Sequence, residues 1–351
     1  MTSQKTTFFP EPETGRLSEE NAKRYFSTLG FAVFLMSVVT FAVSNLLAYA
    51  VYFYLPSLYE SYLFAPILSV FSIYACGLPA LLAVLRRLPK VRPVKEKKSV
   101  GFTLGAFCAC FALVIAGNSV SQMIMTMIET ALGSEVANPV DTSLSSTPIW
   151  VNLLFTVILA PILEELVFRK ILCDRLLPLG EGYAVFLSAS IFALFHGNFY
   201  QLFYAFLLGA CFGYIYVKTG KLGYSVIYHI AINFLCGVLP AFLSSLLDVE
   251  KLNELMEGMA SADEEWVNQV MVFFRENLFP LMGTLGLSAV QTALSVVGAV
   301  LLILFMARKN FSLEEGILPP PKEARISPIF MNFGVALAIA AFAFELILSL
   351  L

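Results

Sequence analysis

Runs of apolar residues, each long enough to cross a lipid bilayer, dominate this 351-residue sequence. Hydrophobic residues make up 58% of the chain and charged residues only 13%, whereas roughly 25% of the residues of a soluble domain are charged. Most of the chain therefore cannot face water, and we expect an all-α polytopic membrane protein. The predicted spans are residues 29–55, 62–85, 100–125, 148–172, 183–197, 199–217, 222–246, 280–307 and 328–350.

The Lys and Arg residues indicate how these spans are oriented, because the cytoplasmic segments of membrane proteins carry an excess of both. With the N-terminus in the cytoplasm, all but two of the 22 Lys and Arg residues fall in cytoplasmic segments, and only Lys251 and Arg275 lie outside. Miscounting one span would destroy this bias. We therefore expect about nine spans, with eight as the alternative count, and for nine spans the N-terminus lies in the cytoplasm and the C-terminus outside.

The spans and the polar stretches between them divide the chain into five segments. In the acidic stretch after the seventh span, apolar residues such as Trp266 and Phe274 recur at helical spacing, which predicts a helix on the outer membrane surface. The six cysteines are scattered through apolar stretches, so we expect neither disulfides nor a thiolate metal site. The segments are a cytoplasmic tail (1–28), N-terminal transmembrane helices (29–147), a transmembrane core (148–245), an external amphipathic segment (246–279) and C-terminal transmembrane helices (280–351).

Charged residues inside the fourth span are the most specific feature of the sequence. An ionisable group at mid-membrane costs on the order of 3 kcal/mol even on insertion scales, so it is usually paired or functional. Glu165 and Arg169 are four residues apart and share one helix face, which predicts an ion pair between them. Glu164 then points elsewhere. Pro161 removes a backbone hydrogen bond one turn earlier and is expected to kink this helix.

Both histidines of the chain, His196 and His229, also fall within apolar spans. Counting about 1.5 Å per helical residue from the nearest cytoplasmic charge, Glu164 lies roughly 16 Å deep and His196 roughly 22 Å. By the same count His229 and Asn233 lie roughly 12 and 18 Å deep, and their spacing of four places them on one helix face. We therefore expect these four side chains to meet near the middle of a bilayer core about 30 Å thick.

These side chains suit two ways of hydrolysing an acyl compound such as a peptide. Glu164 and His196 can take a proton from water, while His229 and Asn233 stabilise the oxyanion. Alternatively, Glu164, His196 and His229 are the ligand types of a catalytic Zn²⁺, which lowers the pKa of its bound water toward 7. A third reading is that the residues only bridge helices through hydrogen bonds.

Three short motifs occur in order along the fourth, fifth and seventh spans. They are Glu164-Glu165-x-x-x-Arg169, Phe192-x-x-x-His196 and His229-x-x-x-Asn233. Together they resemble the motifs of the CAAX prenyl protease type II and bacteriocin-processing family of intramembrane proteases (CPBP, or Abi). The resemblance covers roughly residues 148 to 245, and the polar positions do not depart from the pattern.

The resemblance implies an all-helical membrane protease in which Glu164 and His196 activate the attacking water. It implies that His229 and Asn233 hold the oxyanion or help to bind a metal, and that Glu165 and Arg169 support the site. We expect the lipid bilayer and a membrane-associated peptide or protein as partners, and no nucleic acid. A non-catalytic scaffold or immunity protein is the alternative, and a proton-coupled transporter ranks lower because the sequence has no convincing internal repeat.

Four further residues in the spans are assigned structural roles. We expect Phe192 to fill the core rather than to pack on the ring of His196. Asn118 and Gln122 share a face of the third span, and we rank bridging between helices above lining a cavity. Glu345 falls within two turns of the external end of the last span and is expected to reach the membrane interface.

Overall fold

The nine predicted spans correspond to nine helical stretches in the computed structural model, which describes residues 8, 11, 15–260, 263–308, 311–322 and 327–351. Within these residues, seven stretches are long and apolar enough to cross a membrane. The fifth and ninth predicted spans appear as the shorter helices α10 (Glu181–Leu194) and α18 (Phe333–Leu348). The seven are α1 (Glu19–Tyr54), α3 to α4 (Phe64–Leu85), α5 (Val100–Leu132), α7 to the turn after α9 (Ile149–Leu179), α11 (Phe199–Thr219), α12 to α13 (Leu222–Ser245) and α16 (Leu278–Ala307).

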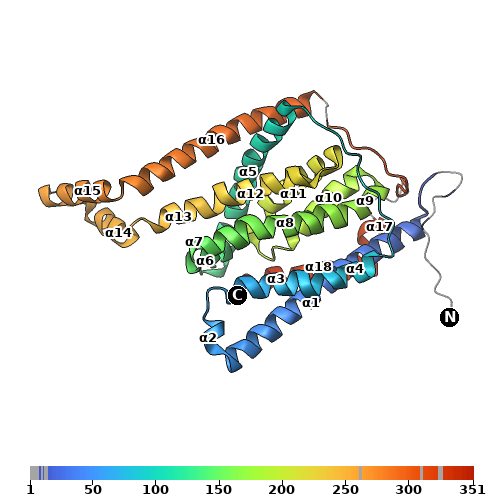
Figure 1. The fold of residues 1–351 in the computed structure, drawn as a ribbon, viewed down its shortest axis with the longest axis horizontal. Coiled ribbons are helices and arrows are strands. Elements are labelled where there is room, and N and C mark those ends of the chain that lie inside the picture. Colours follow the sequence, from blue (N-terminus) through green and yellow to red (C-terminus); the bar gives the residue numbers. More distant parts are fainter. Residues whose placement is uncertain (1–7, 9–10, 12–14, 261–262, 309–310, 323–326) are drawn as a thin grey trace.

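Most of these helices run along the long axis of the molecule (Figure 1). One layer contains α1, α3, α4 and α18, the middle layer contains α8 (Ala160–Glu165) and α10 to α12, and α5 and α16 lie beyond it. Helix α5 is steeply inclined and contacts both α11 and α16. The largest buried cluster lies between the first two layers and includes Tyr25, Phe26, Leu85, Leu172, Leu176 and Tyr216.

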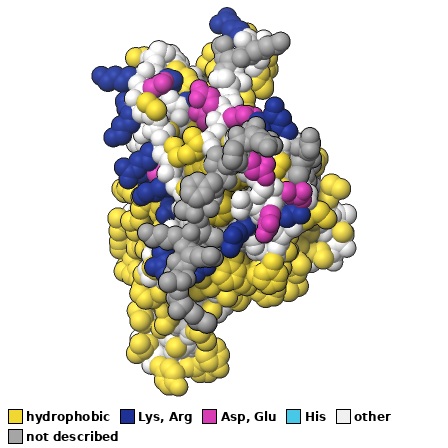
Figure 2. Space-filling view, turned by 90° about the vertical axis from the view of Figure 1, so that its right-hand side faces the viewer, with side chains coloured by type: hydrophobic (Ala, Val, Ile, Leu, Met, Phe, Trp, Pro, Cys, Tyr) yellow, Lys and Arg dark blue, Asp and Glu magenta, His cyan; other side chains and the backbone are white. Residues whose placement is uncertain are grey.

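Figure 2 shows one end of the molecule face-on, and many Lys and Arg side chains gather on it. It contains α9 (Asp174–Leu176) and α17 (Ser327–Phe330). Helices α14 (Val249–Glu257) and α15 (Glu264–Glu276) lie at the opposite end, where Trp266 of α15 donates a hydrogen bond to the Leu255 carbonyl at 2.9 Å. The charge asymmetry agrees with the expected orientation, in which the basic end is cytoplasmic.

The connection between α10 and α11 lies inside the bundle and differs from the expected span 183–197. Helix α10 ends at Leu194, which leaves His196 in a tight turn rather than on a helix. Gly197 permits this turn because its φ of +65° is one that glycine adopts at little cost. Asn198 then caps α11 by accepting a hydrogen bond from the Gln201 amide at 2.9 Å.

Short π-helical stretches interrupt the fourth span on both sides of α8. Residues Leu153–Leu159 and Leu166–Cys173 are π-helical, and Pro161 follows the first stretch as the second residue of α8. The wider π-helical turns accommodate Pro161, whose missing N–H would interrupt the hydrogen bonding of a regular α-helix. Such stretches frequently occur at functional sites. The distortion predicted at Pro161 is thus a change of helix type, which the spacing of residues did not indicate.

Candidate functional site

Glu165 and Arg169 form the predicted ion pair in the middle of the bundle. The Arg169 Nε atom lies 3.1 Å from Glu165 Oε2, and both side chains are completely buried. Arg169 Nη1 also donates to Ser188 Oγ at 3.2 Å, and its guanidinium carbon lies 4.9 Å from the ring centroid of Phe192. Because the two charges neutralise each other, they can remain buried where either one alone would be very costly.

His229 connects this ion pair to Glu164. Its Nδ1 lies 3.2 Å from Glu165 Oε1, and its Nε2 lies 3.7 Å from Glu164 Oε2. The carboxylate of Glu165 acts as the acceptor, so His229 carries a proton on Nδ1. Glu164 is partly exposed, whereas Glu165 is not. The adjacent glutamates therefore have different environments: one lies in the buried ion pair and the other faces accessible space.

His196 is oriented by the backbone of its own turn. Its Nδ1 lies 2.8 Å from the Phe192 carbonyl oxygen. A carbonyl can only accept, so Nδ1 carries the proton and Nε2 of the neutral ring keeps a free lone pair. Asn198 Nδ2 donates to the His196 carbonyl at 2.8 Å and fixes the turn from the other side. His196 is thereby held in the tautomer that leaves Nε2 free to accept a proton.

Phe192 lies between the two imidazole rings. Its ring centroid is 4.8 Å from that of His196 and 5.8 Å from that of His229, both at interplanar angles of 88°. These are edge-to-face contacts, in which the positive edge of one ring meets the negative face of another. Phe192 does fill the core, as expected, because its side chain is buried. It also packs on the ring of His196, a role that we did not expect from the sequence.

Asn233 lies one helical turn beyond His229, at the last residue of α12. Its Nδ2 donates to the Thr156 carbonyl in the first π-helical stretch at 3.0 Å. The second N–H of this amide remains available to another acceptor. The structure thus packs His196 and His229 against Phe192 and places Glu164 beside His229. Asn233 lies one turn from His229 on the side toward α13.

A polar cavity of about 300 Å³ begins at Asn233. Asn118 and Gln122 line it and are exposed, so the expectation that these amides bridge helices was wrong. The inclination of α5, which no local sequence pattern reports, turns their shared face toward the cavity. Sequence reasoning missed the other polar lining residues because most of them lie outside the motifs: Asn138, Asp141, Thr156, Tyr200, Gln201 and Tyr204.

Glu345 does not reach the membrane interface as expected. Ser37 Oγ of α1 donates to its Oε1 at 2.5 Å, and its Oε2 lies 3.8 Å from the position that a Cβ on Gly197 would occupy. Close packing of α18 on α1 explains the difference, because a Cβ on Gly30 would lie 2.5 Å from the Val335 amide nitrogen. The carboxylate is thereby held beside α1 and the turn that carries His196.

The predicted zinc ligands do not form a compact ligand set. Among the described residues, no three His, Cys, Asp or Glu side chains are grouped closely enough to hold a metal ion. Both ring nitrogens of His229 face carboxylates, and Nδ1 of His196 faces a backbone carbonyl. The zinc scheme therefore stays a prediction.

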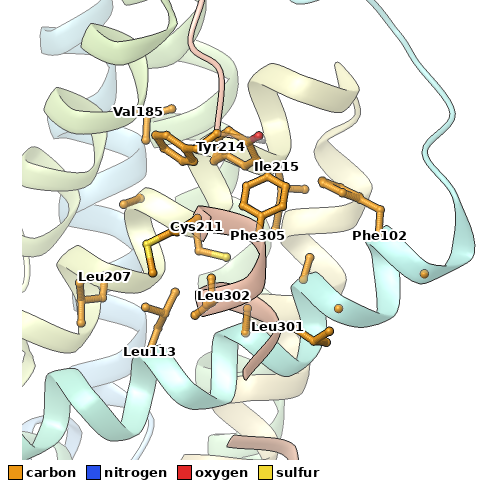
Figure 3. A pocket seen from close by; sticks show the side chains of 17 residues that line it. Phe102, Leu113, Val185, Leu207, Cys211, Tyr214, Ile215, Leu301, Leu302 and Phe305 are labelled. Carbon is orange, nitrogen blue, oxygen red and sulfur yellow. The ribbon is translucent and has the colours of Figure 1, made fainter. Parts of the chain in front are cut away.

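A second cavity, of about 350 Å³, lies between α5, α11 and α16 (Figure 3). Its lining is almost entirely apolar, with Leu113, Leu207, Leu302 and Phe305 prominent in the view. None of its lining residues bears a carboxylate, an imidazole or a carboxamide. Its titratable side chains are limited to Cys211 and Tyr214, so the candidate site is the polar one around Glu164.

Comparisons with known proteins agree with the predicted resemblance. Residues 146–235 match the family model described as type II CAAX prenyl endopeptidase Rce1-like. The chain is 28% identical over 172 residues to the putative membrane peptidase YdiL of Bacillus subtilis (strain 168), covering 47% of this chain and 68% of that protein. It is 31% identical over 156 residues to the membrane-embedded CAAX protease MroQ of Staphylococcus aureus (strain USA300), covering 42% and 60%.

No solved structure matches the chain with significance. The chain thus spans about two thirds of the length of one of these relatives and less than two thirds of the other. The matched segment contains Glu164, Glu165, Arg169, Phe192, His196, His229 and Asn233. The resemblance predicted from the motifs is confirmed, and the matches support a membrane protease.

Proposed function

We propose that this chain, whose residues 146–235 resemble the Rce1-like type II CAAX prenyl endopeptidases, is an intramembrane endopeptidase. It hydrolyses a peptide bond in a membrane-embedded or membrane-tethered substrate. One observation carries the proposal: the partly exposed Glu164 lies 3.7 Å from His229, and its charge also acts on the ring of His196, whose Nδ1 alone is engaged by the Phe192 carbonyl. A carboxylate and an imidazole so placed are the groups that general-base activation of water requires.

In the proposed first step, a water molecule beside Glu164 and His196 attacks the carbonyl carbon of the scissile bond. Its proton passes to the carboxylate of Glu164 or to Nε2 of His196, and the carbonyl becomes a tetrahedral oxyanion. The burial of Glu165 in the ion pair with Arg169 keeps that carboxylate out of the reaction. Only one of the two adjacent glutamates is then available as a base.

The oxyanion requires hydrogen-bond donors, and His229 and Asn233 are placed to supply them. When His229 is protonated on both nitrogens, its Nε2–H and the second N–H of Asn233 can donate to the oxyanion. Collapse of the intermediate breaks the C–N bond, and the proton held by Glu164 or His196 passes to the leaving amine.

The test uses purified chain reconstituted in liposomes with a library of synthetic acylated peptides, and mass spectrometry identifies new peptide termini. We expect the wild type to cleave a subset of the peptides. Glu164→Gln and His196→Ala should each lower kcat/KM by about 10²- to 10⁴-fold, the usual contribution of a general base. Glu254→Gln, on an exposed external side chain, is the matched control and should cleave normally. Equal cleavage by wild type and both site variants contradicts the proposal.

A scaffold or immunity role makes the opposite prediction for the same variants. If the polar cluster only binds a partner, Glu164→Gln retains the cellular function while no peptide is cleaved. Metal content decides between the two hydrolytic schemes. Zinc that copurifies in stoichiometric amount with the wild type and is lost in His229→Ala would favour the metal scheme, because imidazole is a preferred zinc ligand.

A further inference from the structure

The polar cavity that begins at Asn233 extends away from the basic end of the molecule. It lies between α5, α11, α12 and the short helix α6 (Pro139–Ser146), which connects α5 to the fourth span. Asp141 of α6 and Asn138, the N-cap of α6, line it together with Thr156 and Asn233. Since α6 follows the outward-running α5, the cavity leads from the external side of the membrane to the candidate site.

Two carboxamides on α5 line the cavity without a partner. Asn118 and Gln122 are four residues apart and share one helix face. Both are exposed, and neither side chain makes a hydrogen bond within the described part of the chain. An amide facing lipid without a hydrogen-bond partner is costly. These side chains therefore need water or a polar ligand in the cavity.

The lining of the cavity favours one class of ligand. It contains carboxamides, tyrosines and the carboxylate of Asp141, but no Lys or Arg. An anionic lipid headgroup would have no cation to pair with there. A carboxamide carries both donors and acceptors and so complements a peptide backbone, which presents N–H and C=O groups in alternation. A neutral or positively charged peptide suits these groups.

Tyr204 connects the cavity to the reacting groups. It lines the cavity, and the charges of both Glu164 and Asp141 act on it. Asn233 also links the cavity to the site, because it lines the cavity and lies one helical turn from His229. A peptide lying along Asn118 and Gln122 would thus reach Asn233, one helical turn from His229.

We propose that this cavity binds a short extended segment of the substrate, neutral or positively charged, that enters from the external side of the membrane. Asn118 and Gln122 bind its backbone and so determine which peptides reach the site. The inference rests on the proposed endopeptidase function, and it adds to that function the side of entry and the chemical class of the segment next to the scissile bond.

One experiment tests the side of entry without requiring cleavage. Gln122→Cys is placed in a chain whose six native cysteines are replaced, and sealed vesicles of known orientation are treated with a membrane-impermeant maleimide. We expect labelling from the external side only. Met123→Cys, on the neighbouring exposed position outside the cavity lining, is the matched control and should remain unlabelled. Labelling of residue 122 from the cytoplasmic side, or no labelling, overturns the proposal.

Peptide binding is tested with the same thiol in a Glu164→Gln background, so that bound peptide is not cleaved. Acylated peptides from the library should protect Gln122→Cys from the maleimide, and absence of protection by every peptide overturns the proposal. For a cleaved peptide, Asn118→Leu with Gln122→Leu should raise KM about tenfold and leave kcat within about twofold, as expected for two lost hydrogen bonds.

Methylation of the backbone nitrogens of that peptide should raise KM for the wild type but add little for the double variant, because both changes remove the same contacts. An unchanged KM in the double variant shows that the cavity admits only water, which overturns the peptide assignment. If the wild type cleaves no peptide, the proposed endopeptidase function is contradicted. The maleimide labelling and peptide protection experiments still test the cavity proposal, because neither requires cleavage.

Discussion

The Nε2 atom of His229 lies 3.7 Å from Oε2 of Glu164, while its Nδ1 lies 3.2 Å from Oε1 of Glu165. The first separation is too long for a hydrogen bond. The second is within hydrogen-bond range. One imidazole thus joins a buried carboxylate to an accessible one, and this relationship determines the first prediction.

Replacing His229 by glutamine should reduce catalysis more than stability. Loss of one oxyanion donor typically lowers kcat by about 10²- to 10³-fold, and we expect a loss of that size in the peptide-cleavage assay. Tyr228→Phe is the control on the neighbouring residue, since it removes only the hydrogen bond from Tyr228 to the Thr103 carbonyl. A Tyr228→Phe chain that loses as much activity as the His229 variant would refute the assignment.

Breaking the ion pair between Glu165 and Arg169 should destabilise the protein strongly. Arg169→Met leaves Glu165 as a buried carboxylate without its cation, at a cost of about 3 to 5 kcal/mol in the free energy of unfolding. Denaturant titration in mixed micelles measures the change. Lys23→Met removes an exposed ion pair with Glu19 and should change stability by less than about 1 kcal/mol.

The double variant Glu165→Gln with Arg169→Met separates charge burial from packing. It should recover part of the loss, because no uncompensated charge then remains in the bundle. A double variant no more stable than Arg169→Met would show that packing of the arginine side chain, rather than its charge, is responsible for the stability.

The turn that holds His196 requires glycine at position 197. Gly197→Ala forces a side chain into the left-handed region, which costs roughly 1 to 2 kcal/mol, and we expect His196 to move away from its contact with the Phe192 carbonyl. Cleavage should fall more steeply than the unfolding free energy. Gly223→Ala is the matched control, because residue 223 has open space around its Cα and no positive φ. Equal activity losses in the two variants would argue against a special role for the turn.

Ser37 should matter only while Glu345 is present. Ser37→Ala leaves a half-buried carboxylate without its hydrogen-bond donor, which should cost about 1 to 3 kcal/mol of stability. Glu345→Leu removes that carboxylate, so adding Ser37→Ala to it should cost much less. Unfolding midpoints of the four chains form a double-mutant cycle. Additive losses would mean that the two side chains do not interact.

Chelation provides an independent check on the proposed chemistry. Because the described residues contain no group of three metal-ligating side chains, we expect cleavage by the purified chain to survive prolonged treatment with phenanthroline. Cleavage that stops on chelation and returns with added Zn²⁺ would instead support the zinc scheme. A metalloprotease that phenanthroline inhibits, assayed in parallel, serves as the positive control.

The sequence by itself determined the membrane class, most of the helical spans and the pairing of Glu165 with Arg169, and it predicts the orientation of the spans. Each of these follows from local properties: the cost of placing polar groups in lipid, the excess of Lys and Arg in the cytoplasm, and the spacing of four residues on a helix. The motifs also selected Glu164, His196, His229 and Asn233, which lie close together in the structure.

Only the tertiary structure decided where the remaining polar side chains point. The turn at Gly197, the π-helical stretches around Pro161 and the contact between Glu345 and Ser37 depend on how α1, α10 and α18 pack. Asn118 and Gln122 likewise face a cavity because α5 is inclined across the bundle. Transfer from water into lipid depends on each segment alone, whereas packing depends on segments far apart in the chain, so no local pattern in the sequence contained this information.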